Sequence, residues 1–117
     1  MKKIYIVILN GVIFTFSSLP LASAEGISFE TQILPILKNK CSECHGDENP
    51  EVMLTVVNYE ELMQGSEFGI IINPSDPATS YMLEMIETGE MPQDGEAVTS
   101  EELSLIKEWI EEGALNN

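Results

Sequence analysis

Five consecutive residues, Cys41-Ser42-Glu43-Cys44-His45, constrain this chain more than any other feature. Cys41 and Cys44 are three positions apart, so on one turn of helix their sulfur atoms face the same side. From there two thioether bonds can reach the two vinyl groups on one edge of a porphyrin. The adjoining His45 can then place its imidazole under the ring. This C-x-x-C-H run is the attachment signature of c-type haem, and it predicts one covalent haem c held by Cys41 and Cys44, with His45 as an axial iron ligand.

Two other uses of a C-x-x-C pair are weaker explanations here. A structural zinc site normally takes four Cys or His ligands, and the whole chain has two cysteines and one histidine. A dithiol redox pair of the thioredoxin kind needs a βαβ pattern around the motif. The sequence shows no such alternation of strand and helix signals. Both alternatives therefore rank below haem attachment.

The N-terminus resembles a secretory signal peptide. Lys2 and Lys3 precede an apolar stretch, and Ala22-Ser23-Ala24 forms an A-x-A cleavage site. We therefore expect residues 1–24 to be removed and residues 25–117 to form one small domain in the periplasm. An uncleaved membrane anchor is the alternative, because the apolar stretch approaches the length of a membrane span. After cleavage we expect no membrane span.

Capping signals divide the mature chain into short helices. Ser28 can cap a helix that starts at Phe29 and runs to the haem motif, and Pro35 should make that helix bend or restart. Thr99 and Glu102 form a T-x-x-E capping box at the start of the last helix.

Further signals lie between these two helices. Asn58 should cap a helix over residues 59–64, Thr79 or Ser80 should start one that runs to Glu87, and residues 52–57 should be extended against the haem. Together these signals predict an all-α domain of four or five short helices.

With these elements in order, the chain resembles the class I c-type cytochrome domain from about Ile27 to Ala114. The resemblance rests on the first helix feeding Cys41–His45, on Met91-Pro92, and on the ending Leu103…Ile106…Trp109-Ile110…Gly113-Ala114. It implies a cytochrome c fold wrapped around one haem, with the first and last helices crossing. Phe29 and Ile33 are then expected to pack against Ile106, Trp109 and Ile110.

The iron also needs a ligand on the face opposite His45, and the chain has no second histidine to supply it. That leaves a methionine sulfur, another weak ligand or an open position. Met82 and Met85 stand at helical spacing, where methionine usually fills a core, while Met91 lies in a loop between helices. The resemblance implies that Met91, followed by Pro92, supplies the second axial ligand.

The strongly negative charge of the chain limits which macromolecules it can bind. The residues after the leader include three lysines, no arginine and all twenty acidic residues, a formal charge of −17. Nucleic acid and anionic membrane are therefore poor partners. We expect a monomer that meets redox partner proteins through a basic docking patch on the partner, although general surface acidity for solubility or a saline habitat explains the charge equally well.

His and Met ligation together leave no open iron position and favour one-electron chemistry over catalysis. The sequence thus predicts a periplasmic electron carrier that is not an enzyme. Two alternatives stay open: a haem sensor or enzyme with an open sixth position, and an electron-relay subunit of a larger oxidoreductase. The acceptor of the His45 Nδ1 proton is also open, with the Pro50 carbonyl as one candidate.

Overall fold

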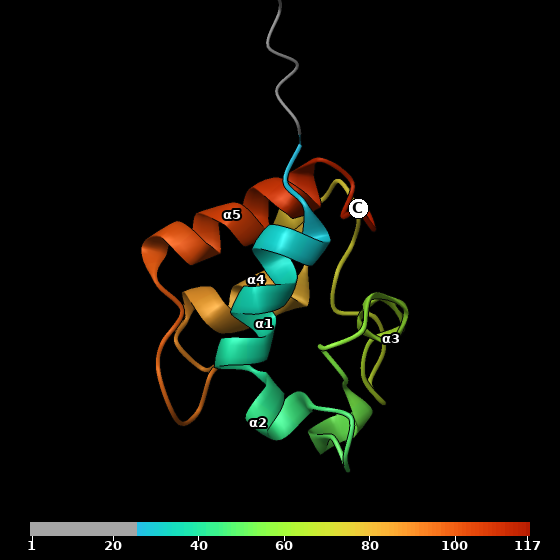
Figure 1. Ribbon diagram of the computed structural model, residues 1–117, viewed down its shortest axis with the longest axis vertical. Helices are drawn as coiled ribbons and strands as arrows, with labels where there is room; N and C mark the ends of the chain where they lie inside the picture. The colour runs from blue at the N-terminus through green and yellow to red at the C-terminus, as the bar shows by residue number, and fades with distance from the viewer. Residues whose placement is uncertain (1–25) are drawn as a thin grey trace, which may run out of the picture.

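Short helices joined by long loops make up the described part of the chain, which in this computed structural model is residues 26–117. The predicted signal peptide lies outside the described residues. Figure 1 shows a single turn of π-helix leading into α1, with α2 below it, α3 to one side, and α4 and α5 above. The helices are α1 Leu34–Lys40, α2 Ser42–His45, α3 Tyr59–Gln64, α4 Tyr81–Glu87 and α5 Ser100–Glu111, with the π-helical turn at Phe29–Ile33 and 3₁₀ turns at Glu51–Met53 and Pro77–Thr79.

The prediction of an all-α domain is confirmed, because residues 26–117 contain no strand beyond one isolated bridge between Ser66 and Gly69. Among these residues, no helix combines the length and the hydropathy that a membrane crossing requires.

Ser28, Asn58 and Thr99 cap their helices as predicted, whereas Ser80, at the N-cap of α4, makes no capping hydrogen bond with its side chain. The Ser28 hydroxyl accepts from the backbone N–H of Thr31 at 3.2 Å, and the Asn58 side chain accepts from Glu61 N–H at 3.2 Å. Thr99 and Glu102 form both halves of the capping box at the start of α5. Each bond satisfies a backbone donor that a helix N-terminus leaves free.

Pro35 also has its expected effect. The chain changes from π-helical to α-helical hydrogen bonding at Leu34, one residue before the proline. Pro35 is thus the second residue of α1, directly after the π-helical turn, and its missing N–H marks the place where the helix restarts.

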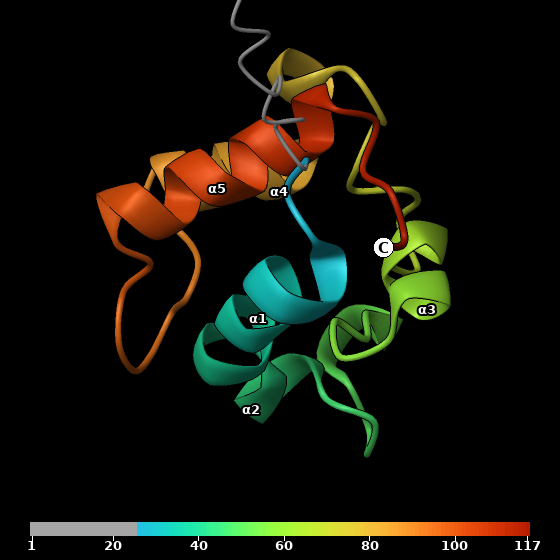
Figure 2. The ribbon, with the colours of Figure 1, turned by 45° about the horizontal axis from the view of Figure 1, so that its top comes forward.

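The first and last helical segments pack together, and Figure 2 shows α5 lying across α4 with the start of the described chain close by. The rings of Phe29 and Trp109 are 5.4 Å apart, and Tyr59 meets Phe29 edge-to-face at 5.2 Å. Ile33 and Ile106 are fully buried in the same core. The expected packing of these two segments is therefore present.

Trp109 lies at the centre of this core. Its side chain has no exposed surface, and its indole N–H donates to the Leu115 carbonyl at 2.9 Å. The Tyr59 hydroxyl donates to the Ala114 carbonyl at 2.7 Å. The segment after α5 thus folds back over Trp109 and closes the core.

Trp109→Ala should lower the free energy of unfolding of the haem-loaded protein by about 3–5 kcal/mol, because it removes a fully buried ring and leaves a cavity. Denaturant unfolding measures the change. Glu108→Ala, one residue away on the exposed face of α5, is the control and should alter the value by less than about 0.5 kcal/mol. Equal effects of the two changes would contradict this account of the core.

The segment after the C-x-x-C-H motif departs from the extended conformation predicted for residues 52–57. Glu51–Met53 form a 3₁₀ turn in which Val52 and Met53 have φ of 49° and 56°, and extended backbone begins only at Leu54. The reason lies at His45, whose carbonyl accepts from Val56 N–H at 2.9 Å while its ring nitrogen meets the Glu51 carbonyl. The chain must turn sharply between these two contacts.

Candidate haem site

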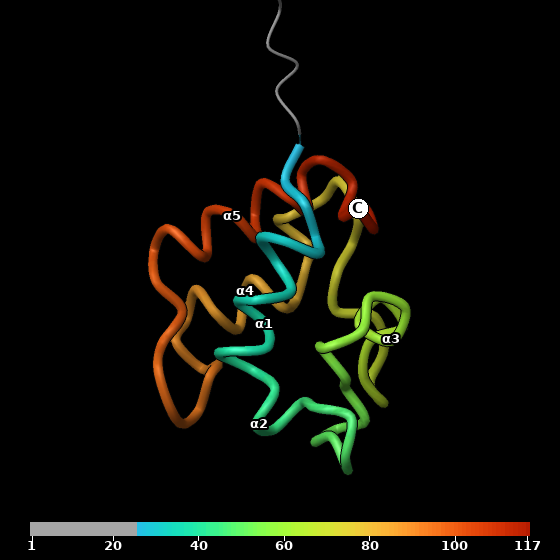
Figure 3. Tube along the Cα trace, in the orientation of Figure 1, coloured from blue at the N-terminus to red at the C-terminus, as the bar shows by residue number. Residues whose placement is uncertain are grey.

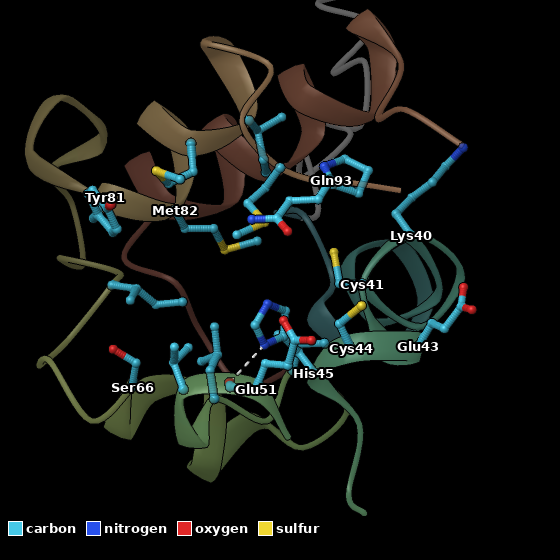
Figure 4. Close-up of a pocket in the computed structure, with 18 of the residues that line it drawn as sticks. Lys40, Cys41, Glu43, Cys44, His45, Glu51, Ser66, Tyr81, Met82 and Gln93 are labelled. Atoms are coloured by element: carbon cyan, nitrogen blue, oxygen red, sulfur yellow. Dashed lines mark hydrogen bonds between the residues drawn. The ribbon is translucent and has the colours of Figure 1, made fainter. Parts of the chain in front are cut away.

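The two cysteines, His45 and Met91 all line one large cavity. It has a volume of about 570 Å³ and a mostly apolar lining, within the range of about 300–1,000 Å³ that is usual for small-molecule and cofactor sites. Figure 4 shows the cavity with α1 and α2 on one side and Tyr81 and Met82 of α4 across from them. Its apolar wall includes Leu54, Val56, Ile71, Met82 and Ile86.

Cys41 and Cys44 lie on the same side of this cavity. Cys41 ends α1 and is half-buried, Cys44 lies in α2 and is exposed, and both are free thiols. Figure 4 shows the two sulfur atoms near each other at the cavity edge. Two thiols aligned along one edge match the two thioether bonds of haem c.

The environment of both thiols favours their protonated form. Burial raises the pKa of the Cys41 thiol to about 11, with smaller contributions from Cys44 and the Glu102 carboxylate. Desolvation, followed by the charges of Glu51 and Glu43, raises the pKa of Cys44 as well. The surroundings therefore do not activate either thiol as a thiolate nucleophile.

His45 reaches the cavity with its ring orientation fixed. The side chain is buried, and its Nδ1 lies 3.2 Å from the Glu51 carbonyl oxygen. A carbonyl can only accept, so Nδ1 carries the proton and Nε2 is left with a free lone pair, which is the state that an iron ligand requires. The acceptor is thus Glu51 and not its neighbour Pro50, because the 3₁₀ turn directs the Glu51 carbonyl toward the ring.

Met91 lines the same cavity from the loop between α4 and α5. It is half-buried, and its backbone N–H donates to the Met85 carbonyl at 3.0 Å. The structure therefore brings Cys41, Cys44 and His45 of the motif and Met91 of a distant loop to one space.

Two further methionines share that space. Met82 and Met85 also line the cavity, and Met82 belongs to the buried core as well. Met53 is 73% exposed and Met63 packs against the core, and neither lines the cavity. Three methionine side chains, those of Met82, Met85 and Met91, are thus available on the cavity wall.

Sequence reasoning missed Lys40, which also lines the cavity. Its side chain is 1% exposed, and its Nζ lies 2.9 Å from Glu96 Oε1 and 3.7 Å from Glu102 Oε2. The hydrogen bond that Lys40 donates to the Glu96 carboxylate outweighs desolvation and raises the pKa of Lys40. The helical spacing contained a signal, because Lys40 follows the buried residues Ile36 and Leu37 at i+4 and i+3.

Comparison with known proteins supports the haem interpretation. Residues 41–95 match the model of a family described as Planctomycete cytochrome C. The matched segment begins at Cys41 and includes His45 and Met91, and it leaves out the first helical segment and α5. No curated protein and no solved structure matches the chain.

The match supports a cytochrome c-like domain in this chain, and such domains carry covalently attached haem c. The residues lining the cavity fit that group, with paired thiols, an imidazole whose Nε2 is free, thioether sulfurs and an apolar wall. A haem-binding electron carrier is the function that the match suggests.

Proposed function

We propose that this protein is a periplasmic mono-haem c-type cytochrome that carries single electrons between redox partners. The observation that supports this most is the gathering of Cys41, Cys44, His45 and Met91 around one apolar cavity. When bound, haem supplies an iron that exchanges one electron at a time. Cys41 and Cys44 would attach it, and His45 Nε2 and the Met91 sulfur would be the axial ligands.

The surrounding residues suit electron transfer. The Glu51 carbonyl holds the tautomer and orientation of His45, and such a hydrogen bond raises the basicity of a ligating imidazole. A thioether as the other ligand favours ferrous iron and raises the reduction potential. With both axial positions filled by protein atoms, no position remains for a substrate.

We further propose that the protein is exported and meets its partners in the periplasm. The leader predicted over residues 1–24 would deliver the chain to the periplasm, where residues 25–117 would act as a monomer. Their formal charge of −17 would attract partners with a basic patch, since charge complementarity accelerates encounter. Four exposed apolar side chains at the cavity, Val52, Phe68, Ile70 and Tyr81, offer a contact surface for such a partner.

The absorption spectrum of the reduced protein, recorded with and without carbon monoxide, tests the electron-carrier function. An electron carrier with two protein ligands should give the same spectrum in both cases, because carbon monoxide finds no open iron position. The spectrum of a haem sensor or enzyme with an open iron position should change as soon as carbon monoxide is added. A relay subunit would resemble the electron carrier in this assay, and copurification of a larger oxidoreductase from the native periplasm would identify it.

Charge-reversal variants test the docking surface. Glu43 lines the cavity and Glu90 precedes Met91, whereas Glu111 stands at the end of α5, outside the cavity lining. We expect Glu43→Lys and Glu90→Lys to slow electron exchange with the physiological partner more than Glu111→Lys does. Stopped-flow kinetics at several salt concentrations provide the measurement.

The same experiment contains its own control. The wild-type rate should fall steeply between 0.01 M and 0.1 M salt, as the Debye length shrinks from about 30 Å to about 10 Å. Equal effects of all three reversals, or a rate independent of salt, would assign the acidity to solubility or habitat.

A further inference from the structure

The loop that carries Met91 is held by few contacts. This segment, residues 88–99 between α4 and α5, is called the Met91 loop below, and Figure 3 traces it in orange past the end of α1. Near its start, Met91 N–H donates to the Met85 carbonyl, and at its end Thr99 caps α5. Between these points, residues 92–98 make no backbone hydrogen bond to any described residue.

Lys40 supplies a contact in the middle of this loop. Its Nζ lies 2.9 Å from a carboxylate oxygen of Glu96, which stands between Pro92 and Thr99 in the Met91 loop. The same ammonium lies 3.7 Å from Glu102 Oε2, and that oxygen also accepts from Thr99 N–H at 2.9 Å. One cation thus joins the end of α1, the Met91 loop and the start of α5.

Burial makes this contact obligatory for Lys40. The Lys40 side chain is 1% exposed and that of Glu96 is 75% exposed. A buried ammonium without a partner is strongly destabilising, so it holds its carboxylates in place. Glu96 lies within residues 92–98, which make no backbone hydrogen bonds to described residues. Its ion-pair partner among the described residues is Lys40. Lys40 therefore fastens the middle of the loop, while Val98, nearer its end, packs against the core.

We propose that Lys40 is a positioning residue that acts through Glu96 to hold the Met91 loop, and with it the Met91 sulfur, at the cavity. The inference rests on the proposed function, because it assigns Lys40 a role in keeping Met91 on the iron. Lys40 also directly precedes Cys41, so the loop is fastened to the same helix end that would carry the haem.

Imidazole titration of the ferric, haem-loaded protein tests this. Imidazole competes for the sixth position, and its binding removes the weak far-red absorption that a sulfur ligand gives to ferric haem. In Glu96→Gln we expect the imidazole concentration at half-loss of this band to fall about two- to five-fold, the range set by a partly exposed ion pair. Lys40→Gln should lower it at least as much, and the double variant should add little to Lys40→Gln.

Matched variants separate loop positioning from general stability. Glu90→Gln removes the same charge from an exposed site in the same loop where Glu90 has no ion pair in the described structure, and it should leave the titration midpoint unchanged. Leu62→Ala, in the core at α3, should lower the thermal midpoint without changing the imidazole midpoint. If Lys40→Gln fails to fold, the exposed Glu96→Gln still gives the answer.

Two failures can be told apart. A wild-type spectrum without the far-red band would contradict Met91 ligation and the proposed function itself. A wild-type band whose imidazole midpoint is the same in Glu96→Gln and Glu90→Gln would overturn the role of Lys40 alone.

Discussion

Met91→Ala is expected to abolish the far-red absorption of the ferric protein and to let carbon monoxide bind the ferrous form. Binding should rise from undetectable to nearly one carbon monoxide per haem, because the change removes the sulfur that fills the sixth position. The reduction potential should fall, since the thioether that favours ferrous iron is gone. Absorption spectroscopy and a redox titration measure all three effects.

Met82→Ala and Met85→Ala are the necessary controls, because both side chains line the same cavity as Met91. Met82 is 8% exposed, so its truncation should lower the free energy of unfolding by about 2–5 kcal/mol and leave the far-red band in place. Met85 is less buried, so its truncation should lower the free energy of unfolding by a smaller amount. A band that disappears in either control and survives in Met91→Ala would reassign the ligand.

Cys41→Ala and Cys44→Ala should each leave at most one thioether bond, and His45→Ala should prevent stable low-spin haem. All three variants should accumulate poorly in the periplasm. The 93 residues that follow the predicted leader form a domain small enough to bury only a modest fraction of its surface, and a large apolar macrocycle would complete its core. Haem staining, mass spectrometry and immunoblotting of periplasmic extracts measure attachment and yield.

Glu43→Gln is the matched control for these variants, because Glu43 is an exposed residue between the two cysteines. It should retain wild-type yield and spectrum. Haem-free protein made without attachment machinery should likewise lack the cooperative thermal transition of the loaded protein. Normal yield and an unchanged spectrum in all three site variants would refute the proposed attachment.

Local chemistry explains why so much of the fold was predictable. Ser28, Asn58 and Thr99 each bond to a backbone N–H three residues ahead, so their effect depends on the adjacent sequence alone. The two cysteines and His45 are likewise neighbours along the chain. These elements therefore appeared where capping rules and motif spacing indicated.

What the sequence did not reveal depends on residues far apart along the chain. The burial of Lys40 depends on Glu96 and Glu102, and the cover over Trp109 comes from the chain end, whose Leu115 carbonyl accepts from the indole N–H. The turn at Glu51–Met53 was missed because an apolar, β-branched run favours a strand, whereas two contacts to His45 require a reversal. Spacing along one helix cannot supply such partners.

Haem attachment is the central claim, and acid–acetone extraction of the purified protein tests it most directly. The full chain is expressed with its leader in a host that attaches haem c in its periplasm, and the extracted polypeptide is examined by absorption and mass spectrometry. One haem should stay with the polypeptide through Cys41 and Cys44. Haem that leaves entirely with the solvent, or a polypeptide that never acquires it, would contradict the account.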